Sequence, residues 1–509
     1  MLFFIKKTLK RDDERERSSI RNRHRHWFCK GNSSKQGEVI QTVTEQLEMI
    51  QPQAGYNEQR PEDWFRATIQ CIRRLLHDPQ MANIEVCGLS LSGQMHSLVI
   101  LDERQQPIRN AILWNDTRTT EQCESIRQVL GDYVLENPVL EGFTLTKLLW
   151  IKSHEPENWA QVKTFLLPKD YVRYKLTGKL YMEHSDASST LLLDADTELW
   201  SKEVARRFNV EHMLPELVAS GDFVGYIEPE LACDLGLKDD VAVFAGGGDN
   251  ACGALGSGVT KDEQTLCSIG TSGVVLSCDS NITTCYRHNL HLFKHVIPKQ
   301  SYVMGVTLAA GDSLNWLRSN ILSDLSYEQI FNEAKASSVG SNGLLFAPFL
   351  SGERTPYGDS SIRGSFVGLS ALHTRGDMAR AVIEGITFSL YESICLLRAK
   401  GKAISEIVAI GGGAKNNFWL QLQADIFNAK VNKLKYEEGP CMGAAILAIN
   451  GLNWYDNLDA IINSCICFEQ SFYPNKERHA EYQNYFEIYK KIYTQTHELT
   501  ANLLALTRK

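Results

Sequence analysis

The sequence predicts an α/β protein built from two domains, and three observations lead to that prediction. Short apolar runs that read as buried strands alternate with longer stretches whose apolar residues recur at helical spacing. A strand followed by a glycine-rich turn occurs twice, at 241–249 and at 406–415. A length of 509 residues also exceeds that of one ordinary domain. Two α/β halves with glycine loops at strand ends imply a cleft between domains, where ligands commonly bind.

Composition narrows the class of protein and of partner. Hydrophobic residues make up 43% of the chain and charged residues 22%, which is typical of a globular protein. The net charge of −8 argues against nucleic acid as a partner and offers no basic face to an anionic membrane. No apolar run is long enough to cross a bilayer. The thirteen cysteines lack the spacing of a zinc site, so we expect reduced thiols in a cytoplasmic protein.

The first 33 residues differ from the rest of the chain. They contain ten Lys or Arg and four Asp or Glu. The apolar run at 2–5 precedes the basic cluster, which is the wrong order for a secretory signal, and the acids argue against a transit peptide. A basic arm that binds RNA is the alternative hypothesis. We expect this segment to form no native-like structure.

From about Lys35 the pattern becomes regular. Residues 37–43 alternate as a strand, and Pro61 followed by two acids opens a helix that continues to about Leu76. The other elements predicted in this half are strands at 84–90, 97–101 and 111–114 and helices ending near 153 and at 171–176.

The second half repeats the alternation. The apolar run at 241–245 predicts a buried strand, so Asp249 lies just past a strand end. A strand at 264–269 turns through Gly270-Thr271-Ser272 into another at 274–276. The remaining predicted elements are strands at 301–308 and 406–410 and helices from 312, at 377–399 and at 419–427, with an apolar segment at 343–349.

The glycine-rich stretch around Asp249 is the strongest functional signal in the chain. Three glycines at 246–248 remove every Cβ before Asp249, so a substrate can approach its carboxylate closely. The turn at 270–272 would direct backbone N–H groups and two hydroxyls outward, which suits a phosphate. A base and a phosphate turn together suggest transfer from a nucleotide to a hydroxyl. The alternative is a structural loop whose aspartate caps a helix.

Three further motifs are weaker signals. The dipeptide Met95-His96 lies at a tight bend between two strands, where the histidine is either a structural hydrogen-bonding group or a ligand contact. Asp116, which follows Asn115 at a strand end, either binds adjacent hydroxyls of a polyol or belongs to a solvated turn. The glycines at 411–413 leave bare backbone against which an adenine ring or ribose could lie.

Together these motifs resemble the FGGY carbohydrate kinases, from about Lys35 to about Gly451. Several matches in the right order make the resemblance specific. They are Ser92-Gly-Gln-Met-His96, Ala111-Ile-Leu-Trp-Asn-Asp116, Gly142–His154, Gly247-Gly-Asp-Asn250, Ser351-Gly-Glu-Arg-Thr-Pro356 and the stretch from Gly364 to Glu384. Within the family, Gly93-Gln94 and the segment at 114–116 favour the members that phosphorylate D-xylulose over those that phosphorylate gluconate.

The resemblance implies a ribonuclease H-like, actin-like pair of domains with ATP, Mg²⁺ and the sugar in the cleft. Its ranges are an atypical segment at 1–34, a sugar-binding domain at 35–251, a nucleotide-binding domain at 252–455 and a helical extension at 456–509. Asp249 would be the general base on the terminal hydroxyl of the sugar, while no residue is assigned to the metal. The matching positions imply sugar contacts at Met95, His96, Asn250 and Asp116 and nucleotide contacts at Gly270, Thr271, Ser272, Gly311, Asn315, Gly412, Gly413 and Asn416.

The resemblance fails at the start of the chain. The family opens with a strand, an Asp-x-Gly-Thr-Ser loop that grips the ATP phosphates, and a second strand, and residues 1–33 contain no such motif. The abrupt onset at Lys35 is what a shifted reading frame or a wrong start would produce. We therefore expect impaired turnover, and an unpaired edge on the strand at 84–90.

Two rival functions stay open at this point. One is a non-catalytic sugar-binding or regulatory protein, and the other is a kinase for another ketopentose or for gluconate. A homodimer is common in the family that the chain resembles.

Overall fold

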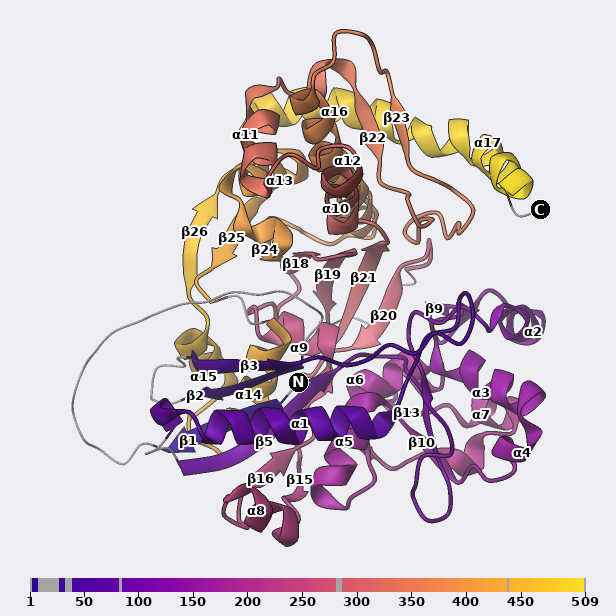
Figure 1. Cartoon of the computed structure of the whole chain (residues 1–509), viewed down its shortest axis with the longest axis vertical. Helices are drawn as coiled ribbons and strands as arrows, with labels where there is room; N and C mark the ends of the chain where they lie inside the picture. Colours follow the sequence, from indigo (N-terminus) through magenta and orange to yellow (C-terminus); the bar gives the residue numbers. More distant parts are fainter. Residues whose placement is uncertain are drawn as a thin grey trace. The chain divides into compact units, whose positions relative to one another are not determined.

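The chain forms two compact units, each built on its own sheet (Figure 1). The computed structural model describes residues 2–7, 27–32, 39–81, 85–280, 286–436 and 439–507. The first unit comprises Met1–Gly258, Phe293–Ser301 and Glu438–Cys467, and the second comprises Val259–Leu292, Tyr302–Glu437 and Phe468–Lys509. No helix within the described ranges is long and apolar enough to span a bilayer, and the cysteines in them form no disulfide.

The first unit is organised around a seven-stranded sheet with the order β15-β16-β5-β1-β2-β3, and β17 pairs with β5 beside this path. Strands β16 and β17 both run parallel to β5, whereas β3 is antiparallel to β2. The strands are β1 (Leu2–Lys7), β2 (Trp27–Asn32), β3 (Val39–Glu45), β5 (Glu85–Gly93), β15 (Phe223–Tyr226), β16 (Ala242–Phe244) and β17 (Gly247–Gly248).

The basic N-terminal segment contributes two of these strands, which corrects the sequence prediction. β1 runs antiparallel to β5, with Leu2 opposite Leu91, and parallel to β2. The expected unpaired edge on the strand at 84–90 is therefore wrong from Glu85 onward, while Ile84 and residues 8–26 lie outside the described part. The physical reason is that an exposed strand edge leaves a row of backbone N–H and C=O groups that favour any available partner.

Helices α1 and α14 pack against strands of the first sheet. Helix α1 (Pro61–Leu76), predicted with these bounds, packs on β2 and β3. Helix α14 (Gly439–Gly451) packs on β5 and on α9 (Asp249–Leu255), although the expected boundaries assigned 439–451 to the second domain. The other helices are α2 (Thr120–Leu130), α3 (Thr144–His154), α4 (Pro156–Trp159), α5 (Pro168–Thr177), α6 (His184–Ala187), α7 (Lys202–Phe208), α8 (Pro229–Leu235) and α15 (Leu458–Cys465).

Short strand pairs and single turns connect these helices. The predicted strand at 97–101 is the shorter β6, and the one at 111–114 is β7, of two residues only. The short elements are β4 (Glu58–Gln59), β6 (Val99–Leu101), β7 (Ala111–Ile112), β8 (Tyr133–Val134), β9 (Asn137–Pro138), β10 (Thr164–Leu166), β11 (Met182–Glu183), β12 (Leu193–Asp194), β13 (Leu199–Trp200), β14 (Leu217–Val218), η1 (Pro79–Met81), η2 (Ser188–Thr190) and η3 (Glu211–Met213).

The second unit contains a sheet with the order β20-β21-β19-β18-β24-β25-β26. Its central strand β18 is antiparallel to β19 and parallel to β24. In the first unit β1 also has one antiparallel and one parallel neighbour, but the strand that follows it along the chain, β2, is the parallel one, whereas β19, which follows β18, is antiparallel. The strands are β18 (Gln264–Ile269), β19 (Gly273–Asp279), β20 (His291–Lys294), β21 (Ser301–Thr307), β24 (Glu406–Gly411), β25 (Lys430–Leu434) and β26 (Phe468–Phe472).

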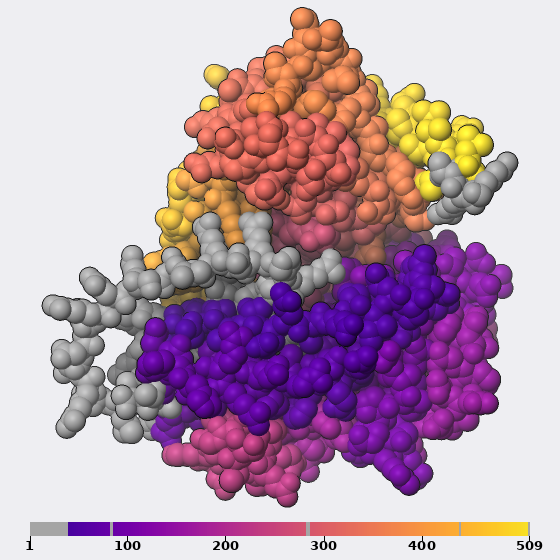
Figure 2. All heavy atoms as spheres, viewed as in Figure 1, coloured from indigo at the N-terminus to yellow at the C-terminus, as the bar shows by residue number. Residues whose placement is uncertain are grey.

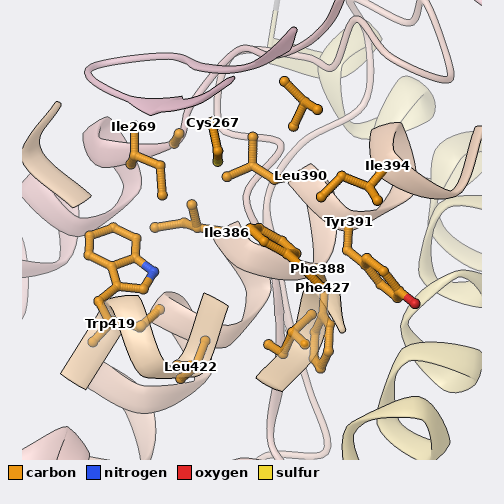
Figure 3. Packing of buried hydrophobic residues seen from close by; sticks show 14 of the residues in the cluster. Cys267, Ile269, Ile386, Phe388, Leu390, Tyr391, Ile394, Trp419, Leu422 and Phe427 are labelled. Carbon is orange, nitrogen blue, oxygen red and sulfur yellow. The ribbon is translucent and has the colours of Figure 1, made fainter. Parts of the chain in front are cut away.

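The core of the second unit lies between this sheet and its helices, around α12 (Arg375–Ala399) (Figure 3). Ile269 at the end of β18, Ile386 on α12 and Trp419 on α13 (Asn417–Phe427) are buried in one cluster. The indole N–H of Trp419 donates to Thr387 Oγ1 at 3.0 Å, so its only polar group is satisfied inside the core. This cluster fixes the ends of β18 and β24 relative to one another.

The remaining elements of the second unit lie around that core. The C-terminal helices α16 and α17, yellow in Figures 1 and 2, lie at its surface. These elements are α10 (Gly311–Asn320), α11 (Tyr327–Ala336), α16 (Lys476–Tyr489), α17 (Lys491–Thr507), β22 (Leu345–Ala347), β23 (Ser365–Val367), η4 (Ser341–Gly343) and η5 (Gly412–Lys415).

Candidate active site

Parallel pairing brings Asp249 to the bend at 94–96 within the first unit. β17 pairs with the end of β5, with Gly247 opposite Ser92 and Gly248 opposite Gly93. Because both strands run in the same direction, the residues that follow them leave the sheet at the same edge. The structure thus brings together residues that are more than 150 positions apart in the sequence, as the sequence predicted from two separate motifs.

Asp249 is the first residue of α9, and Gly248 occupies the N-cap position. Asp249 is therefore not the N-cap of this helix, and the alternative prediction of a capping aspartate is wrong. Asp249 Oδ1 accepts hydrogen bonds from the backbone N–H of Asn250 at 2.9 Å and from its side-chain amide at 3.2 Å. Burial raises the pKa of Asp249 to about 6, against the weaker lowering effect of backbone hydrogen bonds. A carboxylate with this pKa is ionised at neutral pH and still basic enough to accept a proton.

Met95 and Asn250 lie directly beside this carboxylate. A Cβ added to Gly248 would lie 2.9 Å from Met95 Cγ, so a glycine is needed for this close approach. The Asn250 side-chain amide is 3.7 Å from Met95 Sδ, and the Met95 side chain is almost fully buried. Asp249, Asn250 and Met95 therefore form one contiguous cluster.

His96 is held in a defined orientation at the same bend. Its φ of 66° lies in the left-handed region, which is uncommon for a residue with a Cβ. Its backbone N–H donates to Ser189 Oγ at 3.2 Å, and its ring Nδ1 lies 2.8 Å from the Ser189 carbonyl oxygen. Because a carbonyl only accepts, Nδ1 carries the proton, and Nε2 of the neutral ring is an acceptor. The rings of Phe143 and Phe293 pack edge-on against it.

Lys147 holds the backbone of His96 and was not assigned a role from the sequence. Its fully buried ammonium donates to the carbonyl oxygens of His96, at 2.9 Å, and of Gly142. Burial lowers the pKa of Lys147 to about 7. A lysine inside the apolar stretch 145–151 was the available signal, because lysine is rarely buried without a specific partner.

Asp116 has a different environment from the other predicted sugar contacts. Its side chain is buried and accepts hydrogen bonds from the backbone N–H of Asn57, at 2.6 Å, and from the guanidinium and backbone of Arg118. Its oxygens are thus engaged by groups of the protein. The described contacts give Asp116 the role of connecting the 55–59 segment to the 114–118 turn.

The predicted phosphate turn of the second unit is seated on the start of α10. Gly270 N–H donates to the Ser272 carbonyl at 2.9 Å, which closes the turn, and its three residues are at least partly exposed. Gly311 N–H donates to the Gly270 carbonyl at 2.9 Å, and a Cβ on Gly311 would lie 2.2 Å from that oxygen. The structure therefore brings Gly311 to the turn at 270–272, as predicted, and explains why a glycine occupies position 311.

The glycines at 411–413 meet the same turn through the parallel pair β18–β24. Ile269 lies opposite Gly411 in the register, and a Cβ on Gly411 would lie 2.5 Å from the Ile269 carbonyl oxygen. Gly412 and Gly413 continue along Ile269. These contacts place the predicted nucleotide residues Gly270 to Ser272, Gly311, Gly412 and Gly413 around the end of one strand.

Asn416 and Asn315 lie farther along the same loop and helix. Asn416 Oδ1 caps α13 by accepting from the N–H groups of Phe418 and Trp419. Asn416 also lines a pocket of about 420 Å³ whose other residues are Phe331, Asn332, Lys335, Lys415, Asn417, Phe418 and Lys433. Asn315, exposed on α10, accepts a hydrogen bond from the hydroxyl of Tyr327.

A divalent metal has few protein ligands in the part of the chain that the structure describes. No group of three or more His, Cys, Asp or Glu side chains in it could hold a metal ion. Mg²⁺ needs fewer, because it is commonly bound by one or two carboxylates together with substrate phosphates and water. Asp249 is the carboxylate of the cluster described above.

Comparison with known proteins identifies a family domain in each half of the chain. Residues 32–256 match the N-terminal domain, and residues 265–451 the C-terminal domain, of the FGGY family of carbohydrate kinases. A protein of Staphylococcus epidermidis named xylulose kinase is 53% identical over 471 residues, covering 92% of this chain and 95% of the relative. The xylulose kinase of Bacillus subtilis is 46% identical over 474 residues, covering 92% and 95%.

Solved structures agree with the fold. A ligand-bound xylulose kinase from Lactobacillus acidophilus matches with a TM-score of 0.86 at 27% identity, covering 91% of this chain and 94% of that one. A gluconate kinase from the same organism matches with a TM-score of 0.85 at 27% identity over the same shares. The predicted two-domain, actin-like α/β class is thus confirmed, whereas the structural match alone does not separate these two substrates.

Proposed function

Because the chain belongs to the FGGY family of carbohydrate kinases, we propose that it transfers the γ-phosphoryl group of ATP to the terminal hydroxyl of D-xylulose, giving D-xylulose 5-phosphate. The observation that carries this proposal is the cluster of Asp249, Asn250, Met95 and His96 at one edge of the first sheet. The names of the relatives at 53% and 46% identity favour xylulose over gluconate.

The residues of the first unit supply the base and the sugar contacts in this mechanism. Asp249 takes the proton of the terminal hydroxyl as that oxygen forms a bond to the γ-phosphorus. The bond from the γ-phosphorus to the bridging oxygen breaks, and ADP leaves with the electron pair. His96, oriented by Ser189 at the bend that also carries Met95, contacts the sugar. Asn250 orients the Asp249 carboxylate through its backbone and side-chain amide groups.

The residues of the second unit supply the nucleotide contacts. The turn at 270–272 offers two hydroxyls and backbone N–H groups to phosphates. Gly412, which is exposed, and Asn416, which is partly exposed, offer a surface to the nucleoside, and the buried Gly413 supports them by packing on Ile269. Bound Mg²⁺ would neutralise charge on the transferred phosphoryl group, held by phosphate oxygens with Asp249 as the nearby carboxylate.

We further propose that this chain turns over slowly. In the second unit the hairpin β18–β19 carries the phosphate turn, whereas β1 and β2 are parallel and cannot be joined by a hairpin. The described strands β1 and β2 therefore do not form a hairpin like β18–β19, and the sequence at 1–33 contains no Asp-x-Gly-Thr-Ser motif. Loss of one preorganised donor costs about 10²–10³-fold in turnover.

The test measures ADP release with D-xylulose, other ketopentoses and D-gluconate as acceptors. We expect D-xylulose to give the highest kcat/KM, and Asp249→Ala to lower kcat about 10²–10⁴-fold. In a second protein, residues 1–34 are replaced by a strand, an Asp-x-Gly-Thr-Ser loop and a second strand. Its kcat should exceed that of the unmodified chain by at least about 10²-fold. Higher kcat/KM with gluconate would overturn the substrate, and binding of D-xylulose without turnover in either chain would favour a non-catalytic sugar-binding protein.

A further inference from the structure

A network of buried charged and hydroxyl groups lies behind the loop that carries Asp249. Lys169, Asp170, Arg173, Glu183 and Asp186 are all fully buried, and they contact one another and this loop. Buried charges are expensive unless they are paired or hydrogen-bonded. Here the ammonium of Lys169 lies 2.6 to 3.7 Å from three carboxylates, those of Asp170, Asp186 and Glu183. The mechanism above assigns none of these residues a role.

Glu183 is the centre of the contacts made toward the loop. Its carboxylate accepts from the backbone N–H of Ser185 at 2.7 Å, from Ser185 Oγ at 2.7 Å and from Ser220 Oγ. Ser185 Oγ in turn accepts from the N–H of Gly248 at 2.9 Å, and the Ser220 carbonyl accepts from the N–H of Gly246 at 3.0 Å. Two serines thus connect one carboxylate to the backbone N–H groups of Gly246 and Gly248.

The other end of the loop is held by the two cations of the network. Arg173 Nη1 donates to the Ala245 carbonyl at 3.1 Å, and Lys169 Nζ lies 3.5 Å from the same oxygen. Lys169 also lies 3.7 Å from the Glu183 carboxylate. The backbone from 245 to 248 is therefore fixed at three points directly before Asp249.

We propose that Glu183, acting through Ser185, is a positioning residue for Asp249, an inference that rests on the proposed base function of Asp249. The hydroxyl of Ser185 has one proton, and Glu183 accepts it, so the oxygen lone pair points at Gly248 N–H. Replacing the carboxylate by an amide places an NH₂ group opposite either the Ser185 or the Asp186 backbone N–H, which both donate to Glu183. Displacement of a reacting group by about 1 Å can cost about 10²-fold in rate.

The test compares Ser185→Ala and Glu183→Gln with Thr68→Ala in the full chain. Thr68 is an equally buried hydroxyl of the first unit that donates to a backbone carbonyl within α1. We expect kcat with D-xylulose to fall about 10–100-fold in the first two variants, with a much smaller change in KM. In an Asp249→Asn background, Ser185→Ala should lower turnover little further, because both changes act on one group. Hydrogen exchange followed by mass spectrometry should show faster exchange at 246–250 in Ser185→Ala and not in Thr68→Ala.

Two results would overturn the inference. One is a decrease in kcat in Ser185→Ala that is no larger than in Thr68→Ala. The other is that Ser185→Ala lowers kcat by the same factor in the Asp249→Asn background as in the unmodified chain. If the unmodified chain does not phosphorylate D-xylulose, the proposed function fails, and exchange at 246–250 then decides the positioning role by itself.

Discussion

Replacing Asp249 by Asn should stabilise the protein at neutral pH while it lowers turnover about 10²–10⁴-fold. Burial raises the pKa of Asp249 from 3.8 to about 6, so the folded protein binds this proton more tightly than the unfolded chain. Stability contributed by the protonated form is complete below about pH 4 and is lost as pH rises to about 6. The shift corresponds to at most about 3 kcal/mol, and residual solvent contact of this half-buried residue lowers the expected gain to about 1–2 kcal/mol.

The assay follows the melting temperature of both proteins by calorimetry between pH 4.5 and pH 7.5. The variant should melt at a higher temperature at pH 7.5, and the difference should shrink as the pH falls toward 4.5. Turnover of the unmodified chain should fall about tenfold at pH 5, where about a tenth of Asp249 is ionised. A difference in melting temperature that does not change with pH would refute the reasoning, as would an Asn variant with undiminished kcat.

Other residues give independent predictions. Lys147→Met should raise the KM for D-xylulose about tenfold and change kcat less, because the carbonyl oxygen of His96 loses a charged hydrogen-bond donor. Initial-rate measurements check this, and an unchanged KM would contradict it. Gly411→Ala should lower the melting temperature of the second unit and raise the KM for ATP. An alanine there would adopt a φ of 85° and place its Cβ 2.5 Å from the Ile269 carbonyl oxygen, which costs about 1–3 kcal/mol. Calorimetry and ATP titration check this, and unchanged values would contradict it. Burial raises the pKa of Glu353 from 4.5 to about 8, so the stability that its protonated form contributes is lost as the pH rises from about 4.5 to about 8. In Glu353→Gln the free energy of unfolding should fall less over this pH range. A fall as steep as that of the unmodified protein would exclude Glu353 as the cause.

Local patterns in the sequence were sufficient for the elements and for the residue types of the site. Periodicity predicted α1 with its observed bounds and β18 likewise, because the face that each element buries is determined by its own residues. The glycines before Asp249 and the turn at 270–272 were recognisable for the same reason. They mark backbone that must bend or allow close approach, which is a local requirement.

Only the tertiary structure decided which polar groups meet. Asp116, a predicted sugar contact, accepts from Asn57 and Arg118. Lys147 donates to the carbonyl of His96, and Glu183 is connected through Ser185 to Gly248, the residue before Asp249. Asn57 lies 59 positions from Asp116, Lys147 lies 51 from His96, and Ser185 lies 63 from Gly248. The partner of such a buried polar group depends on which elements pack together, not on its neighbours in the chain. The direction of β1 was equally inaccessible, since a short apolar strand can pair either way and the sheet around it selects one.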